Sequence, residues 1–341
     1  MYFTKIDNRQ GSILIIALWS LCLLTTFVVY SGLIVRQKLN LVGRLNTREG
    51  LFFMGESGVN TGILELRKKD TSDSYYALNE NWSNSPGAFK NVALSSGSFT
   101  ISYSYVEEGT KKLRYGLMDE TSKININKAD VKVLSRLLEV AADLNDQRAL
   151  SLAHCIVDWR DVDSFFSHPQ YGAEDSDYKN LKAPYEAKDA DFEVIEELLL
   201  IRGMDEEVFG KIEDFITVYG EGIVNINTAP RTVLLILGLS RGLTTKILQF
   251  RKGDDSMSGT FDDNVFSSIS GIVLDITVDD LLSTSEVEEL TNLVSNGIFI
   301  TKSSDFMIKC LAELNNKDER SEITAIADQD GFIRYWRQNY Y

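Results

Sequence analysis

The sequence predicts an α+β protein in which one N-terminal membrane helix precedes an antiparallel sheet that carries a large helical insertion. Three observations support this fold class. Residues 12–35 contain no charged side chain. Apolar and polar residues alternate, as they do in strands, near residues 99–118 and again at 306–337. Residues 123–297 are mostly helical in their periodicity. Because strands before and after a helical block can share one sheet, the block is interpreted as an insertion.

The uncharged stretch is long enough to cross a membrane as a helix. Its 24 residues, at ~1.5 Å each, span about 36 Å, and a hydrocarbon core is roughly 30 Å thick. A secretory signal core is shorter, about 7 to 15 residues, and ends in a small-residue cleavage site, which is missing after Tyr30. Charged residues and a glycine precede the stretch instead, so Gly11 and Ser12 resemble the cleavage site of prepilin peptidase, with residues 1–11 as its leader. On this segment alone, a plain N-terminal anchor is the alternative.

The elements after the membrane stretch follow from the local pattern. The helical pattern continues to about Arg67. Residues 70–96 are rich in Ser, Asn, Asp, Gly and Pro, so we expect a loop there. Strands are expected at 99–105 and 113–118, and an antiparallel meander is expected at 306–314, 322–328 and 332–337.

The helical block contains an internal repeat. Residues 124–130, Ile-Asn-Ile-Asn-Lys-Ala-Asp, recur as Val-Asn-Ile-Asn-Thr-Ala-Pro at 224–230. In each copy a short strand brings an asparagine to a turn, and helices are expected behind the turns at 131–140 and 232–238. Pro230 suits the first turn of such a helix. The repeat indicates a pair of small helical modules, and chance recurrence of a common strand-turn-helix phrase is the alternative.

Composition limits the possible partners. The 341 residues are 44% hydrophobic and 25% charged, as in a globular protein. The formal net charge is −15, and because residues 1–50 carry six basic and two acidic side chains, the remainder holds −19. Such a body repels phosphate backbones, so no nucleic acid partner is expected. Of the three cysteines, Cys155 and Cys310 lie outside the membrane stretch, and the sequence does not say whether they pair.

The chain offers little for catalysis but has one candidate metal loop. It lacks the G-x-S-x-G, P-loop, H-E-x-x-H and G-x-G-x-x-G motifs and has two histidines, so we expect no enzyme. Zinc is disfavoured because His154, Cys155 and His168 do not reach four ligands. Carboxylates in a flexible loop suit Ca²⁺, although their spacing here is not that of an EF-hand, and a solvated acidic loop is the alternative. Five carboxylates gather within 17 residues: Asp161, Asp163, Glu174, Asp175 and Asp177.

Several phrases along the chain together resemble a known family. They are the apolar helix after Gly11, the two Asn-x-Asn-x-Ala repeats, Asp-Trp-Arg-Asp-Val-Asp at 158–163, Gly-Ala-Glu-Asp-Ser-Asp-Tyr at 172–178, Leu-Leu-Ile-Arg-Gly-Met at 199–204 and Ile-Arg-Tyr-Trp-Arg at 333–337. In this order they resemble the minor pseudopilin K of type II secretion systems, also called general secretion pathway protein K. The resemblance covers nearly the whole chain.

The resemblance implies a domain plan, a location and partners. A pilin-like domain is expected in two parts, 36–122 and 298–341, with an inserted helical domain, similar to SAM-like or helix-hairpin-helix domains, at 123–297. A single span at 12–35 implies an inner-membrane protein with its globular domain in the periplasm. The family places such a protein at the tip of the pseudopilus with the minor pseudopilins I and J, initiating or capping the filament for export of folded proteins. The family also binds calcium in the inserted domain, which supports the five acidic residues as ligands.

One departure from the general pilin pattern fits a tip subunit. Most pilin-like subunits carry a glutamate five residues after the cleavage site, where this chain has Ile16. A carboxylate at membrane depth costs on the order of 2.5 to 3.5 kcal/mol, and in such filaments it pairs with the terminal amine of the subunit above. A subunit at the tip has no neighbour above it. A plain apolar anchor residue is the alternative at this position.

Two other functions share part of this pattern. The repeats also resemble helix-hairpin-helix modules, which would make the chain a membrane-anchored DNA-binding protein of a DNA-uptake system. Those modules bind phosphate with a glycine-rich turn, whereas the first copy here has Leu-Glu-Val-Ala-Ala-Asp at 138–143, without glycine and with two acids. A minor pilin of a type IV pilus tip would show the same features and differ only in its partners.

Overall fold

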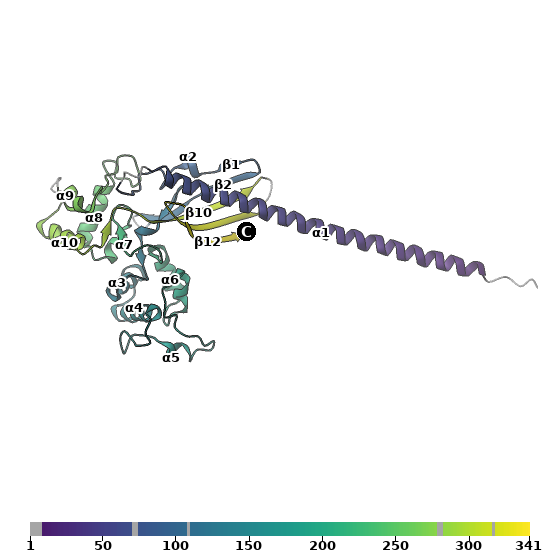
Figure 1. The fold of residues 1–341 in the computed structure, drawn as a ribbon, viewed down its shortest axis with the longest axis horizontal. Helices are drawn as coiled ribbons and strands as arrows, with labels where there is room; N and C mark the ends of the chain where they lie inside the picture. The colour runs from purple at the N-terminus through teal and green to yellow at the C-terminus, as the bar shows by residue number, and fades with distance from the viewer. Residues whose placement is uncertain (1–8, 70–73, 108–109, 278–281, 316–317) are drawn as a thin grey trace, which may run out of the picture.

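A computed structural model describes residues 9–69, 74–107, 110–277, 282–315 and 318–341. The predicted α+β fold class is confirmed: one long helix packs on an antiparallel sheet, and a helical region lies between the strands (Figure 1). Residues 1–8 of the predicted leader lie outside the described residues.

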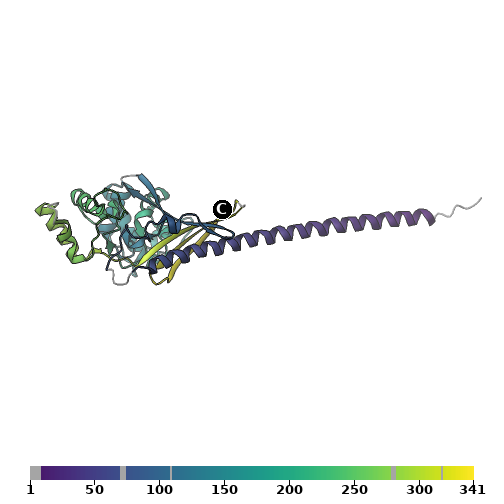
Figure 2. The ribbon, with the colours of Figure 1, turned by 90° about the horizontal axis from the view of Figure 1, so that it is seen from above.

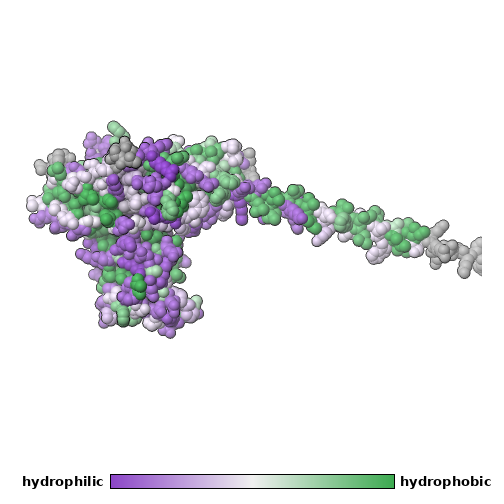
Figure 3. Space-filling view, in the orientation of Figure 1, coloured by the Kyte–Doolittle hydropathy of each residue, from purple (hydrophilic) through white to green (hydrophobic). Residues whose placement is uncertain are grey.

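The first helix has a free half and a packed half. Helix α1 (Arg9–Arg67) ends where the periodicity predicts and has 59 residues, which at ~1.5 Å per residue is about 88 Å. Its N-terminal half projects from the body in two perpendicular views (Figures 1 and 2), and its apolar side chains there are exposed (Figure 3). It is a helix long and apolar enough to cross a membrane, with a mean hydropathy of 2.5 over its most apolar window.

The packed half of α1 lies on the sheet through small residues. Gly55, Gly58 and Gly62 face side chains of the sheet, among them Ile323 and Cys310. A Cβ on Gly58 would overlap the Cys310 Sγ and come within 3.1 Å of the Phe99 ring. The helix axis can therefore approach the sheet closely because no side chain stands between them. Larger residues on either side of the glycines fill the core: Leu51, Met54, Val59, Ile63 and Leu66.

The main sheet is antiparallel and joins distant parts of the chain. Its order is β1-β2-β10-β11-β12, with β5 also pairing with β10. The strands are β1 (Val92–Leu94), β2 (Gly97–Ile101), β5 (Met118–Asp119), β10 (Asp305–Leu314), β11 (Arg320–Asp328) and β12 (Ile333–Tyr340). Strand β10 pairs with β2, Cys310 opposite Ile101, so the C-terminal meander completes a sheet that begins before the helical region.

Two strand predictions need a correction. The stretch 113–118 is not one strand, because one strand ends at Arg114 and β5 begins at Met118. The alternation over 99–105 predicts one strand, but the chain leaves the sheet at Ser102 and forms a separate hairpin of β3 (Tyr103–Glu107) and β4 (Thr110–Arg114). The pattern of alternation continues because β2 buries Phe99 and Ile101 and β3 buries Tyr103. At the base of the hairpin, the guanidinium of Arg114 donates to the Ser258 carbonyl and lies 4.2 Å from the centroid of the Tyr105 ring.

The helical region consists of two lobes that correspond to the predicted repeat (Figure 1). Its remaining elements, with α2 (Pro86–Phe89) from the preceding loop, are η1 (Glu120–Ser122), β6 (Ile124–Asn125), α3 (Val131–Ala142), α4 (Asp146–Arg160), α5 (Asp175–Tyr178), η2 (Ile195–Leu200), α6 (Glu206–Ile212), η3 (Glu213–Phe215), β7 (Ile216–Thr217), β8 (Val224–Asn225), α7 (Arg231–Ile236), α8 (Arg241–Arg251), η4 (Ile269–Gly271), α9 (Ile272–Thr277), α10 (Thr284–Ser295) and β9 (Phe299–Ile300). Module 1, from β6 to β7, and module 2, from β8 to β9, are each closed by a parallel strand pair.

The two modules share the same hydrogen bonds, not only a similar sequence. The Asn125 side chain accepts from the Asn127 N–H at 2.8 Å, and Asn225 accepts from Asn227 at 2.9 Å. The second asparagine of each copy then binds the backbone of a distant phenylalanine, Phe192 or Phe266, in both directions. An arginine that ends the second helix of each module also donates to the turn: Arg160 to the carbonyls of Ile126 and Ala129, and Arg251 to that of Ala229. These matched contacts mean that the repeat is structural.

The body contains two hydrophobic cores. One lies between α1 and the main sheet, and the other runs through both helical modules. Cys310 belongs to the first core and Cys155 to the second, and both thiols are free. The pairing that the sequence left open is therefore absent from this structure.

Candidate functional site

The acidic loop of module 1 is organised by a buried aspartate at the end of α4. Asp158 is fully buried, and its two carboxylate oxygens accept from the backbone N–H groups of Ser167 and Ala173, each at 2.8 Å. Gly172 allows this approach, since a Cβ there would overlap the Asp158 carboxylate. Residues 161–174 are thereby folded back against the end of α4.

This arrangement brings three carboxylates together with oxygens that have no hydrogen-bond donor. They are both oxygens of Glu174, the Oδ1 of Asp161 and the Oδ1 of Asp189. Glu174 is only 3% exposed. Asp163 is exposed at the edge of the same group and interacts electrostatically with the other carboxylates. Buried carboxylate oxygens without donors are costly, so this group has the character of a site for a positive partner.

The pKa values of these carboxyl groups are raised by the same burial and by the negative charge of their neighbours. Burial, reinforced by the negative charge of Asp158 and Asp161, raises the pKa of Glu174 to about 7. Burial and the charge of Asp163 raise the pKa of Asp161 to about 6. The pKa of Asp189 is also raised, first by burial and then by neighbouring acids. In each case a nearby cation would reverse the shift.

The other two predicted ligands are engaged elsewhere. Asp175 accepts from the Lys179 ammonium at 2.7 Å and from the Ala187 N–H at 2.9 Å, and the lysine contact and this N–H lower its pKa. Asp177 forms an ion pair with Arg202 and accepts from the Glu174 N–H at 3.2 Å. The structure therefore brings Asp161, Asp163 and Glu174 together and holds Asp175 and Asp177 in local contacts.

Sequence reasoning missed Asp158 and Asp189. Asp158 lies in the last turn of α4, three residues before Asp161, which follows the helix as its C-cap. This spacing brings the two side chains near each other and could have drawn attention to Asp158. Asp189 comes from a loop beyond α5 and has a backbone φ of 51°. Its N–H donates to the Trp159 carbonyl at 3.1 Å, and this long-range contact brings it to the site. Nothing in the local sequence signals that contact.

The donor set fits a hard cation. All the available groups are carboxylate oxygens, which are the ligands that calcium prefers, with backbone carbonyls and water completing its shell. Within the described part of the chain, no three His, Cys, Asp or Glu side chains already stand in a metal-binding arrangement. The donorless oxygens of Asp161, Glu174 and Asp189 nevertheless meet the first requirement of such a site, because a bound cation would supply the charge that they lack.

The predicted cleavage site lies at the other end of the molecule. The backbones of Gly11 and Ser12 belong to the first turn of α1, which ends at Arg67, 56 residues after Gly11. Ile16 follows on the same free segment and is 65% exposed. Its neighbours on the helix are also apolar and exposed, so the segment offers a continuous apolar surface.

Comparisons with known proteins agree with this architecture. The family model described as "Type II secretion system (T2SS), protein K" matches residues 113–221, which begin at the end of β4 and include module 1. Among solved structures, a chain of the GspK-GspI-GspJ complex from the type 2 secretion system of enterotoxigenic Escherichia coli is similar. The TM-score is 0.66 and the identity 16%, over 87% of this chain and 99% of that chain. Curated protein sequences give no significant match. Residues 113–221 are thus similar to the protein K family of type II secretion systems, and the fold as a whole is similar to that of a chain of the GspK-GspI-GspJ complex.

Proposed function

We propose that this protein is the tip subunit of a type II secretion pseudopilus, where it initiates or caps the filament that exports folded proteins. The observation that carries this proposal is the free half of α1: its apolar side chains are exposed on all sides, and the body leaves them uncovered. Such a surface is stable only in a bilayer or against other apolar helices. In this proposal the segment 12–35 first spans the inner membrane once, with the body in the periplasm, and later packs among neighbouring pseudopilin helices.

The width of the body supports a terminal position. Module 1 extends to one side of the sheet, and α9 and α10 lie at the end of the body away from the free half of α1 (Figures 1 and 2). A subunit within a shaft needs room for a neighbour above it. The absence of a carboxylate at Ile16 agrees with this position, since a carboxylate in the bilayer would have no amine to pair with there.

The minor pseudopilins I and J are the partners that this proposal names. They are named with protein K in the complex whose chain is similar to this one, and the fold match extends over nearly all of that chain. In the membrane, the protein would also contact other pseudopilins and prepilin peptidase. Of the alternatives, a type IV pilus tip would use the same helix with different partners.

We also propose that module 1 holds a calcium ion. Asp161, Glu174 and Asp189 would supply its oxygens, with Asp163 at the exposed edge and Asp158 holding the loop in place. Bound calcium would supply the positive charge that offsets their repulsion and would fix the loop between α4 and α5. Asp175 and Asp177 are better assigned to orienting that loop through Lys179 and Arg202.

The first test concerns the leader. When the full chain is expressed with prepilin peptidase, we expect cleavage after Gly11, so that Ser12 becomes the mature N-terminus. Replacing Gly11 by leucine should abolish cleavage, and replacing Gly32, which lies inside the apolar stretch, should leave it unchanged. N-terminal sequencing measures both. Retention of Met1 by the unmodified chain, or a cut beyond Val35, would contradict the assignment.

The second test concerns the tip position. Single cysteines introduced near Arg36, in a chain whose Cys22 is replaced by serine, should crosslink to pseudopilins I or J and not to successive copies of the major pseudopilin. Ile16→Glu should give no gain in assembly, because its carboxylate costs a few kcal/mol in the bilayer without a paired amine. Mass spectrometry of crosslinked pseudopili identifies the neighbours. Regular crosslinks along the shaft would rule out the tip position.

A further inference from the structure

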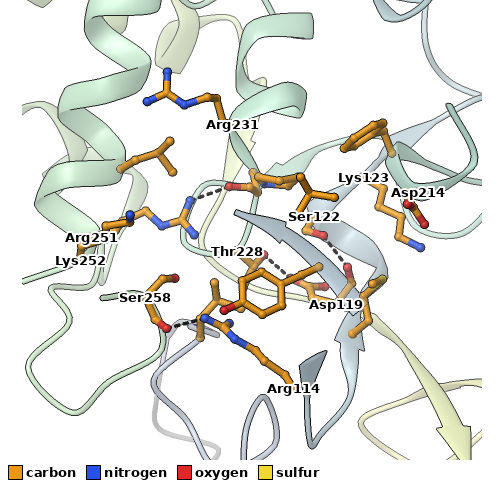
Figure 4. Close-up of a pocket in the computed structure, with 18 of the residues that line it drawn as sticks. Arg114, Asp119, Ser122, Lys123, Asp214, Thr228, Arg231, Arg251, Lys252 and Ser258 are labelled. Atoms are coloured by element: carbon orange, nitrogen blue, oxygen red, sulfur yellow. Dashed lines mark hydrogen bonds between the residues drawn. The ribbon is translucent and has the colours of Figure 1, made fainter. Parts of the chain in front are cut away.

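Glu174 is the carboxylate of the acidic site in module 1 that its own side-chain contacts hold least. It is 3% exposed, and both of its carboxylate oxygens lack a hydrogen-bond donor. Asp119 shows the usual arrangement of a buried carboxylate. It is equally buried, but it accepts from the Thr228 hydroxyl (Figure 4) and from the Thr121 N–H. The position of Glu174 must therefore depend on contacts of its backbone and of its neighbours in the chain.

The charges around Glu174 would move it toward solvent. The acidic side chains of Asp158, Asp161 and Asp189 act on it, and a carboxylate among like charges is more stable in water. Within the residues that the structure describes, no lysine or arginine side chain pairs with Glu174. A group that binds the neighbouring chain must hold Glu174 against this repulsion.

Arg202 holds the chain on both sides of Glu174. Before Glu174, the guanidinium donates to the Gly172 carbonyl at 2.6 Å and to the Tyr171 carbonyl at 3.3 Å. After Glu174, the guanidinium forms an ion pair with Asp177. Asp177 in turn binds the Glu174 backbone twice: its carboxylate accepts from the Glu174 N–H at 3.2 Å, and its own N–H donates to the Glu174 carbonyl at 2.7 Å. One side chain thus fixes the backbone over residues 171–177.

The turn that carries Arg202 is itself fixed. Arg202 lies just after η2, and its N–H donates to the Tyr178 hydroxyl at 3.4 Å. Gly203 has a φ of 90°, and the Met204 N–H donates to the Ile201 carbonyl at 3.1 Å, which closes the turn. This turn is formed by the Leu-Leu-Ile-Arg-Gly-Met phrase at 199–204. The phrase therefore supports the acidic site from a distance of more than 20 residues in the chain.

We propose that Arg202 is the positioning residue of this acidic site. It holds Glu174 where a cation can use both of its free oxygens, and it keeps Asp177 engaged, so that Asp177 is not a ligand. This inference rests on the calcium site proposed above. Charge alone would have the opposite effect, because a nearby positive charge disfavours a bound cation. Geometry and charge therefore predict opposite changes in calcium affinity when Arg202 is replaced.

The test measures calcium binding by the full chain in detergent micelles at about pH 8, with isothermal titration calorimetry. Arg202→Gln and Arg202→Lys should both weaken binding by about tenfold or more, since groups that orient metal ligands are typically worth about 10- to 100-fold in affinity. Lysine keeps the charge but lacks the planar fork that reaches both sides of Glu174. A merely structural role would lower the stability equally with and without calcium and would leave the dissociation constant unchanged.

Amide hydrogen exchange in chelator gives a second readout that needs no metal. Residues 171–178 should exchange at least about tenfold faster in both variants, because their backbone has lost the contacts of Arg202. Helix α3 of the same module should exchange as in wild type, which would show that the module stays folded.

The matched control is Arg320→Gln. Like Arg202, Arg320 is partly exposed and pairs with one carboxylate, that of Glu313 at 2.9 Å, but it lies in the main sheet. It should leave calcium binding and the exchange of residues 171–178 unchanged. Tighter binding by Arg202→Gln, an unchanged dissociation constant in both Arg202 variants, or unchanged exchange over 171–178 would overturn this inference and leave the calcium site in place. No saturable binding by wild type would overturn the calcium site and this inference together.

Discussion

Replacing Gly58 by leucine is expected to destabilise the body by about 3 kcal/mol. The reason is steric: the first atom of any side chain at this position overlaps the Cys310 Sγ and lies within 3.1 Å of Phe99, and both residues are buried in the sheet core. Neither neighbour can rotate into free space, so α1 must move away from β10. Chemical denaturation of the full chain in detergent, followed by tryptophan fluorescence, measures the loss.

Gly43→Leu is the matched control for this prediction. Gly43 lies on the same helix, and a Cβ there has no neighbour within 4 Å. Leucine is a better helix former than glycine by about 0.5 to 1 kcal/mol, so the control should be neutral or slightly stabilising. Equal destabilisation by both substitutions would mean that the cost arises from the helix itself and not from its packing on the sheet.

The long helix and the repeat could be predicted because their signals are local. An uncharged run that is longer than the thickness of a bilayer predicts α1. The Asn-x-Asn-x-Ala phrase forms the same turn in both modules, because the side chain of the first asparagine accepts from the N–H of the second. The sequence indicates less clearly that Gly55, Gly58 and Gly62 of α1 pack on the sheet. Their role depends on what faces them, and Cys310 and Ile323 come from strands more than 250 residues away.

The features that the sequence did not predict depend on distant contacts. Tyr103 and Tyr105 continue the alternation of β2, so nothing local shows that the chain turns away at Ser102 to meet module 2. Asp189 is similar, since it reaches the acidic site through a backbone bond to Trp159 and not through any local motif. In the acidic loop, the number of carboxylates suggested a metal site. Only the structure separates those that have lysine or arginine partners from those that lack a donor.

The calcium proposal predicts opposite effects of one substitution in two conditions. In chelator at pH 8, Glu174→Gln should raise the stability of the full chain by on the order of 1 to 2 kcal/mol, because it removes a buried charge surrounded by like charges. In excess calcium the same variant should be the less stable protein, because it has lost a ligand. Wild-type protein should gain about 2.7 kcal/mol at 100 times the Kd, and the variant should gain little. Glu193→Gln, whose side chain is 86% exposed, is the control and should follow wild type in both conditions.

The stabilities of the metal-free and the calcium-bound protein should also change with pH in different ways. The pKa of Glu174 is raised to about 7 and that of Asp161 to about 6 in the metal-free fold, above their values in an unfolded chain. A raised carboxyl pKa stabilises the fold when the group is protonated, so the metal-free protein should lose stability as pH rises from about 4.5 to 7. Calcium requires the ionised carboxylates, so its stabilising effect should be full above pH 7 and disappear toward pH 5. Thermal unfolding across this range, in chelator and in millimolar calcium, should give two curves that diverge as pH rises. Parallel curves, or a melting temperature that calcium leaves unchanged at pH 8, would show that these carboxylates do not bind the ion.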